Sequence, residues 1–117
     1  LQGDWSSDVC SSDLGISACH ICPLLLAQEI DRAAFMNGMK ERGIQTSIHY
    51  PPVHLFSYYR DRFGFQEGML PLTEMVTRRE VTLPLYPGMH DEDVIRVVGA
   101  LVDTLATTPS NGGVNGR

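Results

Sequence analysis

The residues best suited to chemistry lie in one short segment, which reads His-Tyr-Pro-Pro-Val-His over residues 49–54. Proline restricts its own φ and pushes the residue before it towards an extended conformation, so this segment is a stiff loop. His49, Tyr50 and His54 therefore present two imidazoles and a phenol with little conformational freedom to lose on binding. The segment is a candidate binding loop, and the alternative is an ordinary proline-rich turn that closes a strand.

The histidines and the lysine of this chain do not build a catalytic centre by themselves. His49 and His54 are separated by two prolines and cannot share a helix face, and no dense set of Asp, Glu or Cys accompanies them, so we expect no metal site. Lys40 is the only lysine and lies in a Lys-Glu-Arg run at the end of an amphipathic segment. That setting is typical of a solvated side chain rather than of the desolvated lysine of a Schiff base. We expect no catalytic residue in this chain.

The periodicity of apolar residues predicts a mixed fold of strands and helices. The expected elements are a strand over 16–26, a helix over 31–42, a strand over 44–48, short helices over 55–63 and 72–80, a strand over 81–85 and a helix over 91–105. Asp31 is the expected N-cap of the first long helix and Gly43 its stop. Strands covered by helices on one face predict an α/β (α+β) two-layer sandwich.

The last helix has the clearest pattern. Asp91, Glu92 and Asp93 lie at its N-terminal end, where the helix dipole stabilises carboxylates. Its apolar residues repeat at helical spacing and predict one wide apolar face. These residues are Val94, Ile95, Val97, Val98, Leu101, Val102 and Leu105.

Composition sets both ends of the chain apart. Residues 4–14 are rich in Ser and Asp, lack periodicity and match one reading-frame translation of a common sequencing adapter. We therefore interpret residues 1–14 as an artefact, with a disordered leader as the alternative. Residues 107–117 have the composition of a flexible tail. The folded domain is therefore expected over residues 15–106, which is enough chain for one modest core.

Charge and cysteine usage exclude some partners. The formal net charge is −5 and no basic stripe is present, so we expect no nucleic-acid partner. No apolar run has the length of a membrane span, so we expect no membrane partner. We interpret Cys19 and Cys22 as small buried apolar residues, and unpaired thiols suit a reducing compartment, which predicts a cytoplasmic location.

Several separate motifs share their order and spacing with one family. They are Gly43-Ile-Gln-Thr-Ser-Ile-His-Tyr-Pro-Pro-Val-His54 followed by Tyr58-Tyr59-Arg60, Ser17-Ala-Cys-His20, Asp31-Arg32-Ala-Ala-Phe35, and Leu83-Pro-Leu-Tyr-Pro-Gly-Met89 followed by Asp91-Glu-Asp-Val94. Together they resemble the C-terminal segment of the DegT/StrS-type sugar aminotransferases, which are fold-type-I enzymes dependent on pyridoxal 5'-phosphate (PLP).

The resemblance implies that residues 15–106 are the small C-terminal domain of such an enzyme, closing the cleft of a larger domain that carries PLP on a lysine. Members move an amino group from an amino acid, usually L-glutamate, to a keto group on a nucleotide-linked sugar, typically as homodimers. The PLP lysine would lie upstream of Ile16. We therefore expect this chain to be a fragment that is inactive alone and that supplies the substrate-side wall of the cleft.

The resemblance also suggests substrate-binding residues. His49, Tyr50 and His54 would lie on a loop that faces the cleft, with His49 and Tyr50 as polar contacts to substrate and His54 as a contact or a brace of the loop. His20 would face the cleft from its strand, with a core histidine as the alternative. The cofactor-binding residues of the family are not assigned to positions in this chain.

Two other functions stay open. The first is a PLP-dependent sugar dehydratase of the same family, in which histidine replaces the PLP lysine. The second is a non-catalytic α/β ligand-binding module that stands alone. A free-standing module predicts a surface without a large apolar patch, whereas a domain that has lost its partner leaves an apolar face bare.

Overall fold

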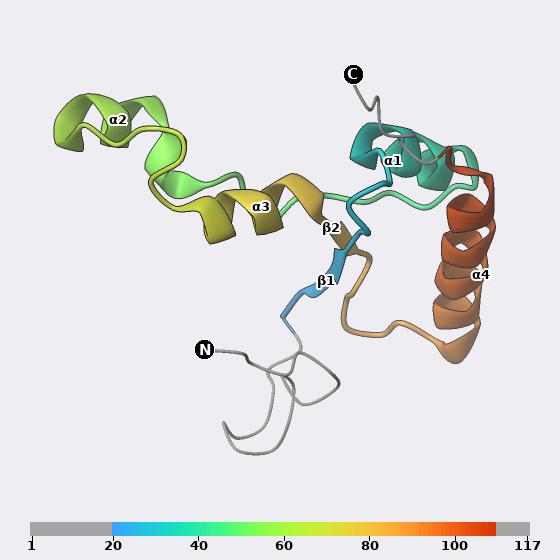
Figure 1. Ribbon diagram of the computed structural model, residues 1–117. Helices are drawn as coiled ribbons and strands as arrows, with labels where there is room; N and C mark the ends of the chain where they lie inside the picture. The colour runs from blue at the N-terminus through green and yellow to red at the C-terminus, as the bar shows by residue number, and fades with distance from the viewer. Residues whose placement is uncertain (1–19, 110–117) are drawn as a thin grey trace, which may run out of the picture.

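The computed structural model describes residues 20–109, where two short strands and five helical segments follow one another along the chain (Figure 1). The elements are β1 (Cys22–Leu25), α1 (Arg32–Glu41), the 3-10 helix η2 (Val53–Leu55), α2 (Ser57–Phe63), α3 (Pro71–Arg79), β2 (Glu80–Leu83) and α4 (Asp91–Thr107). The helices predicted over 31–42, 72–80 and 91–105 are confirmed. The helix predicted over 55–63 is divided into η2 and α2.

The two strands form a small antiparallel sheet in which Cys22 lies opposite Leu83 and Leu25 opposite Glu80. Strand β2 is buried over its first three residues, whereas β1 is largely exposed. Leu24 packs against the core, but Cys22 lies at the outer end of this edge strand and is exposed. The predicted burial of Cys22 is therefore wrong. Cys19 and residues 1–14 lie outside the described part of the chain.

The strand predicted over residues 44–48 is also wrong. Its pairing with β2 is limited to one bridge, in which Ser47 and Thr82 exchange two backbone hydrogen bonds of 3.1 and 2.8 Å. Beyond this bridge the His49 N–H donates to the side chain of Glu80 instead of to a backbone carbonyl. Pro51 and Pro52, which have no N–H, cannot extend a ladder. The apolar pattern of residues 44–48 is compatible with a strand, but the backbone hydrogen bonds that would extend a ladder beyond Ser47 are not formed.

Helix α1 has the ends that its sequence predicts. The Asp31 side chain accepts a 2.7 Å hydrogen bond from the Ala34 N–H, which satisfies one of the free donors of the first turn. At the other end Gly43 has a φ of 75° and its N–H donates to the Lys40 carbonyl at 2.9 Å. A left-handed residue at this position favours glycine, because other side chains are strained there.

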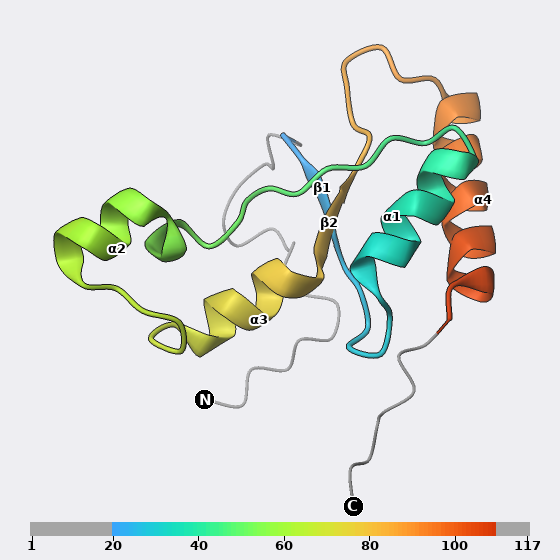
Figure 2. The same ribbon diagram turned by 90° about the horizontal axis from the view of Figure 1, so that it is seen from above.

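The core lies between the sheet and two helices. Helices α1 and α4 pack together on one side of the strands, so sheet and helices form two layers (Figures 1 and 2). The buried apolar residues are Leu26, Phe35, Met39, Ile44, Val81, Val97 and Ala100. They come from β2, from both helices and from the segments that flank α1. The predicted mixed α/β fold is confirmed.

Helix α4 begins after His90, whose N–H donates to the Asp93 side chain at 3.0 Å. It buries Val97, Ala100 and Thr104, but only part of its predicted apolar face is covered. Five apolar side chains of α4 have exposed fractions from 38% to 70%: Val94, Ile95, Val98, Val102 and Leu105. At 3.6 residues per turn they fall within an arc of roughly 100°. We call these five residues the α4 stripe.

On the other side of the strands the chain forms an extension that we call the arm, residues 53–79, which contains η2, α2 and α3 (Figures 1 and 2). Its tip is rich in aromatic side chains. Tyr59 stacks on Phe63 and Phe63 on Phe65, with ring centroids 6.2 and 5.6 Å apart. Within residues 20–109, none of the helices combines the length and the apolar character that crossing a membrane requires.

Helices α1 and α4 approach each other closely at Gly38. A Cβ placed on Gly38 would lie 2.8 Å from Thr104 Cγ2, and the Thr104 side chain is fully buried. We expect Gly38→Ala to lower the free energy of unfolding by about 1 kcal/mol, because the steric cost of about 1–3 kcal/mol exceeds the gain in helix propensity of about 1 kcal/mol. Urea denaturation measures this change.

The control is Gly38→Ala in the Thr104→Ser background, because Thr104→Ser removes the methyl group that clashes. In that background Gly38→Ala should raise the free energy of unfolding, because only the gain in helix propensity remains. Equal effects of Gly38→Ala in both backgrounds would contradict the proposed contact.

Candidate functional site

Three of the four predicted substrate-binding residues line one surface hollow. His20, His49 and Tyr50 meet Tyr86 around a space of about 380 Å³ that borders β2. This volume lies within the range of small-molecule sites in proteins. Residues that are far apart in the sequence are brought together because β2 passes between the segment before His49 and the start of β1.

The His49 side of the hollow is held by several contacts. The His49 N–H donates to Glu80 Oε2 at 3.0 Å, and His49 Nδ1 lies 3.4 Å from Ser47 Oγ. The His49 and Tyr50 rings meet edge to face, with centroids 4.9 Å apart and an interplanar angle of 86°. The peptide bond between these two residues is cis. Tyr50 remains 62% exposed, so its ring and hydroxyl are available to a ligand.

Tyr86 was missed as a site residue by the sequence analysis, which named it only within the motif that ends at Met89. It follows β2 and is 51% exposed at the edge of the hollow. One signal was available in the sequence. Tyr86 precedes Pro87 just as Tyr50 precedes Pro51, and each Tyr-Pro pair follows a segment that the sequence predicts to be a strand.

His54 does not line this hollow. It lies in η2 with only 7% of its surface exposed, and its Nε2 is 3.0 Å from Glu74 Oε1. Because a carboxylate only accepts hydrogen bonds, the His54 N–H donates to it. A direct contact of His54 with a ligand stays a prediction, and the geometry favours the alternative that His54 braces the loop.

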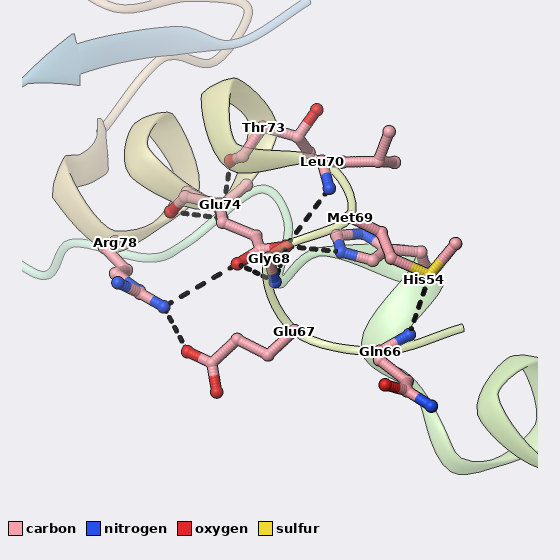
Figure 3. A network of polar contacts seen from close by, with 10 residues as sticks. His54, Gln66, Glu67, Gly68, Met69, Leu70, Thr73, Glu74 and Arg78 are labelled. Atoms are coloured by element: carbon pink, nitrogen blue, oxygen red, sulfur yellow. Dashed lines mark hydrogen bonds and ion pairs between the residues drawn. The ribbon is translucent and has the colours of Figure 1, made fainter. Parts of the chain in front are cut away.

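Glu74 is the centre of the network that His54 joins (Figure 3). Its carboxylate also accepts hydrogen bonds from the N–H groups of Gly68, at 2.9 and 3.0 Å, and of Leu70, at 3.3 Å. Arg78 Nη2 lies 3.8 Å from Glu74 Oε2 and pairs with Glu67 on the surface. One side chain of α3 thus ties η2 and the 66–70 loop together.

The same contacts lower the pKa of Glu74. The hydrogen bond from His54 has the largest effect, and the Gly68 and Leu70 N–H groups add to it. Burial acts in the opposite direction, because it disfavours the charged form, but the hydrogen bonds outweigh it. Glu74 is therefore an ionised carboxylate near neutral pH.

The hollow can bind but has no equipment for group transfer. Its lining offers hydroxyl and amide groups from Ser47, Gln45 and Thr82, together with imidazole and phenol groups. Among the described residues that line it, none is Lys, Arg, Asp or Glu. Hydrogen-bonding groups beside aromatic faces suit a polar ligand. In the described residues no group of three or more His, Cys, Asp or Glu side chains could hold a metal ion.

Comparison with known families identifies the chain. The model of the DegT/DnrJ/EryC1/StrS aminotransferase family matches residues 6–102. The chain belongs to this family. The resemblance derived from the separate motifs is thereby confirmed. The match begins within residues 1–14, which lie outside the described part of the chain, so the interpretation of that segment as an artefact stays a prediction.

Two curated relatives are similar to most of this chain. The uncharacterized protein MJ1066 of Methanocaldococcus jannaschii is 44% identical over 87 residues, which is 72% of this chain and 22% of that protein. The spore coat polysaccharide biosynthesis protein SpsC of Bacillus subtilis is 36% identical over 95 residues, which is 78% of this chain and 24% of that protein. The chain therefore spans about a quarter of the length of these relatives.

A solved structure shares the fold. Helicobacter pylori PseC, an aminotransferase involved in the biosynthesis of pseudoaminic acid, superposes with a TM-score of 0.68 at 22% identity. The alignment covers 74% of this chain and 24% of PseC. The fold is thus that of a part of this aminotransferase.

The family implies PLP as a cofactor, but the described residues do not fit it. PLP enzymes hold the cofactor on a lysine in a desolvated pocket. Lys40 is the only lysine of the chain, and its side chain is exposed at the end of α1. Residues 20–109 therefore offer no suitable attachment point, and no chemical step through PLP is assigned to them.

The lowered pKa of Glu74 predicts a pH dependence of stability. A carboxylate with a lower pKa in the folded state stabilises the fold above its ordinary pKa near 4.5, and this contribution is lost as pH falls through the lowered value. We expect the free energy of unfolding to fall on acidification below about pH 4.5, as measured by urea denaturation from pH 7 to pH 2. Glu74→Gln should reduce stability at pH 7 and flatten this acid limb.

The matched control is Glu29→Gln, which removes an exposed carboxylate. It should leave both the stability at pH 7 and the acid limb close to those of the wild type. If Glu74→Gln and Glu29→Gln gave the same profile, the Glu74 network would not be the source of the acid sensitivity.

Proposed function

We propose that this chain is the substrate-side part of a PLP-dependent aminotransferase that moves an amino group from an amino acid, L-glutamate, to a keto group on a nucleotide-linked sugar. In this proposal the chain supplies one wall of the active-site cleft and is inactive alone. The parent protein is a cytoplasmic homodimer in which a larger domain holds PLP. Family membership supports the reaction class.

The observation that carries the proposal is the hollow lined by His20, His49, Tyr50 and Tyr86. Its hydrogen-bonding groups and exposed rings match the hydroxyl groups and C–H faces of a sugar. The names of two similar proteins also concern sugar chemistry, since SpsC is named for polysaccharide biosynthesis and PseC for pseudoaminic acid biosynthesis. His49 and Tyr50 are the proposed polar contacts, and His20 and Tyr86 complete the wall.

The α4 stripe favours the interpretation that this domain packs against further protein. The alternative of a free-standing binding module does not explain the stripe. Contiguous apolar surface of this kind marks an interaction site in soluble proteins, and five apolar residues of α4 share one exposed arc. The dehydratase of the same family remains the second candidate. It differs at the residue that carries or replaces the PLP lysine, and only the larger domain contains that residue.

The proposal predicts that this chain does not attach PLP. When PLP is added to the purified chain, we expect no absorbance band that depends on Lys40, because an exposed amine lacks the desolvated pocket that activates it. The matched variant is Lys40→Met, which should give the same spectrum as the wild type. A band present in the wild type and absent from Lys40→Met would contradict the assignment of PLP to another domain.

A second prediction concerns the protein of family length, obtained by extending this reading frame in the source DNA. Tyr50→Phe and His49→Ala should each raise the KM for the keto sugar nucleotide by about 3- to 10-fold, because each removes a hydrogen bond worth about 1 kcal/mol. The KM for glutamate should not change. Tyr58→Phe, which alters an exposed tyrosine of the arm, is the control and should match the wild type.

Steady-state kinetics with varied sugar nucleotide measure these changes. A protein that transfers no amino group from any amino acid, or that eliminates water from the sugar instead, would exclude the aminotransferase. A normal KM in both variants would exclude His49 and Tyr50 as substrate contacts.

A further inference from the structure

The register of β2 shows where a third strand would pair with it if the ladder that begins at Ser47 continued regularly. Ser47 and Thr82 exchange both backbone hydrogen bonds, and hydrogen-bonded pairs recur two residues further along an antiparallel ladder. The next such pair is His49 with Glu80. On its other edge β2 pairs Glu80 with Leu25, and the Arg79 carbonyl accepts from the Leu26 N–H. The Glu80 carbonyl therefore belongs to the edge that carries Ser47 and His49, whereas the Glu80 N–H already donates to the Val76 carbonyl at the end of α3.

The regular bond is absent at this pair. The His49 N–H donates to Glu80 Oε2 at 3.0 Å instead of to the Glu80 carbonyl. That carbonyl lies 3.4 Å from an Arg32 guanidinium nitrogen. A side-chain carboxylate thus replaces a backbone carbonyl as the acceptor, which holds His49 away from the line of the ladder.

The carboxylate that makes this bond is itself fixed. Glu80 is 7% exposed, and a buried carboxylate is unfavourable unless its oxygens are hydrogen-bonded. The Thr82 hydroxyl donates to Glu80 Oε1, which leaves Oε2 directed to the His49 N–H. Thr82 is 5% exposed within β2, so both ends of this arrangement are anchored in the sheet.

We propose that Glu80 is a positioning residue: its carboxylate directs the chain out of the sheet at Ser47 and sets the His49 and Tyr50 rings at the hollow. The bond acts on the amide of the residue whose ring meets Tyr50 edge to face. Glu80 itself does not line the hollow. The expected effect of Glu80 on substrate binding rests on the proposed function, whereas its effect on the conformation of the loop does not.

The test uses NMR of the isotopically labelled 117-residue chain and needs no ligand. Glu80→Met keeps the length and burial of the side chain and removes the acceptor. We expect the His49 amide proton to exchange with solvent about tenfold faster relative to the amides of α1, and the nuclear Overhauser contacts between the His49 and Tyr50 rings to disappear. Glu80→Gln keeps an acceptor oxygen and should restore both signals.

Glu29→Gln is the control and should leave both signals as in the wild type. If Glu80→Met does not fold, Thr82→Val decides, because it removes the hydroxyl that orients Oε1 and keeps a β-branched strand residue. We then expect faster His49 exchange and weaker ring contacts in Thr82→Val. Unchanged His49 exchange and ring contacts in the folded Glu80→Met variant, or in Thr82→Val in its place, would overturn the proposal.

In the family-length protein the same variants separate this proposal from the proposed function. Glu80→Met should raise the KM for the sugar nucleotide about as much as His49→Ala, and Glu80→Gln should stay near the wild type. A protein without aminotransferase activity would defeat the proposed function and leave the NMR result intact. Altered NMR signals with an unchanged KM would show that Glu80 shapes the loop without affecting substrate binding.

Discussion

Strand β2 bonds on both edges, to β1 on one and to Ser47 on the other, and the rest of the described structure is arranged around it. Its Val81 is completely buried in the core that α1 and α4 cover. The arm precedes it and the turn with Tyr86 follows it. A strand of four residues can hold these segments together because its backbone donors and acceptors bond to two other parts of the chain.

Two buried glutamates hold loops that β2 does not hold in a regular ladder. Glu74 lies in the first turn of α3 and Glu80 directly after that helix. Glu74 accepts hydrogen bonds from the N–H groups of Gly68 and Leu70, and Glu80 accepts one from the N–H of His49. Both loops lack regular secondary structure, so their N–H groups need acceptors from elsewhere. A carboxylate in a protected position supplies several strong acceptor sites. Helix α3 therefore connects the part that stabilises the arm with the part that shapes the hollow.

The surface of the domain divides into regions with different partners in the proposed enzyme. The hollow beside β2 is lined by hydrogen-bonding groups and aromatic rings, whereas the α4 stripe is apolar. The chain spans about a quarter of its relatives' length. The PLP chemistry of the family requires groups that residues 20–109 do not supply in a suitable setting. The two surfaces together fit a domain that contributes binding and closure to a larger enzyme.

The sequence alone determined the local features: the ends of α1 at Asp31 and Gly43, the helical period of α4, and the motifs that identify the family. Each depends on residues within a few positions of one another, so spacing is sufficient to predict it. Only the tertiary structure decided that residues 44–48 form a single bridge, that the α4 stripe is exposed, and that His54 is buried. It also placed Tyr86 beside His49. These outcomes depend on which distant groups compete for a hydrogen bond or cover a face, and no local pattern records that competition.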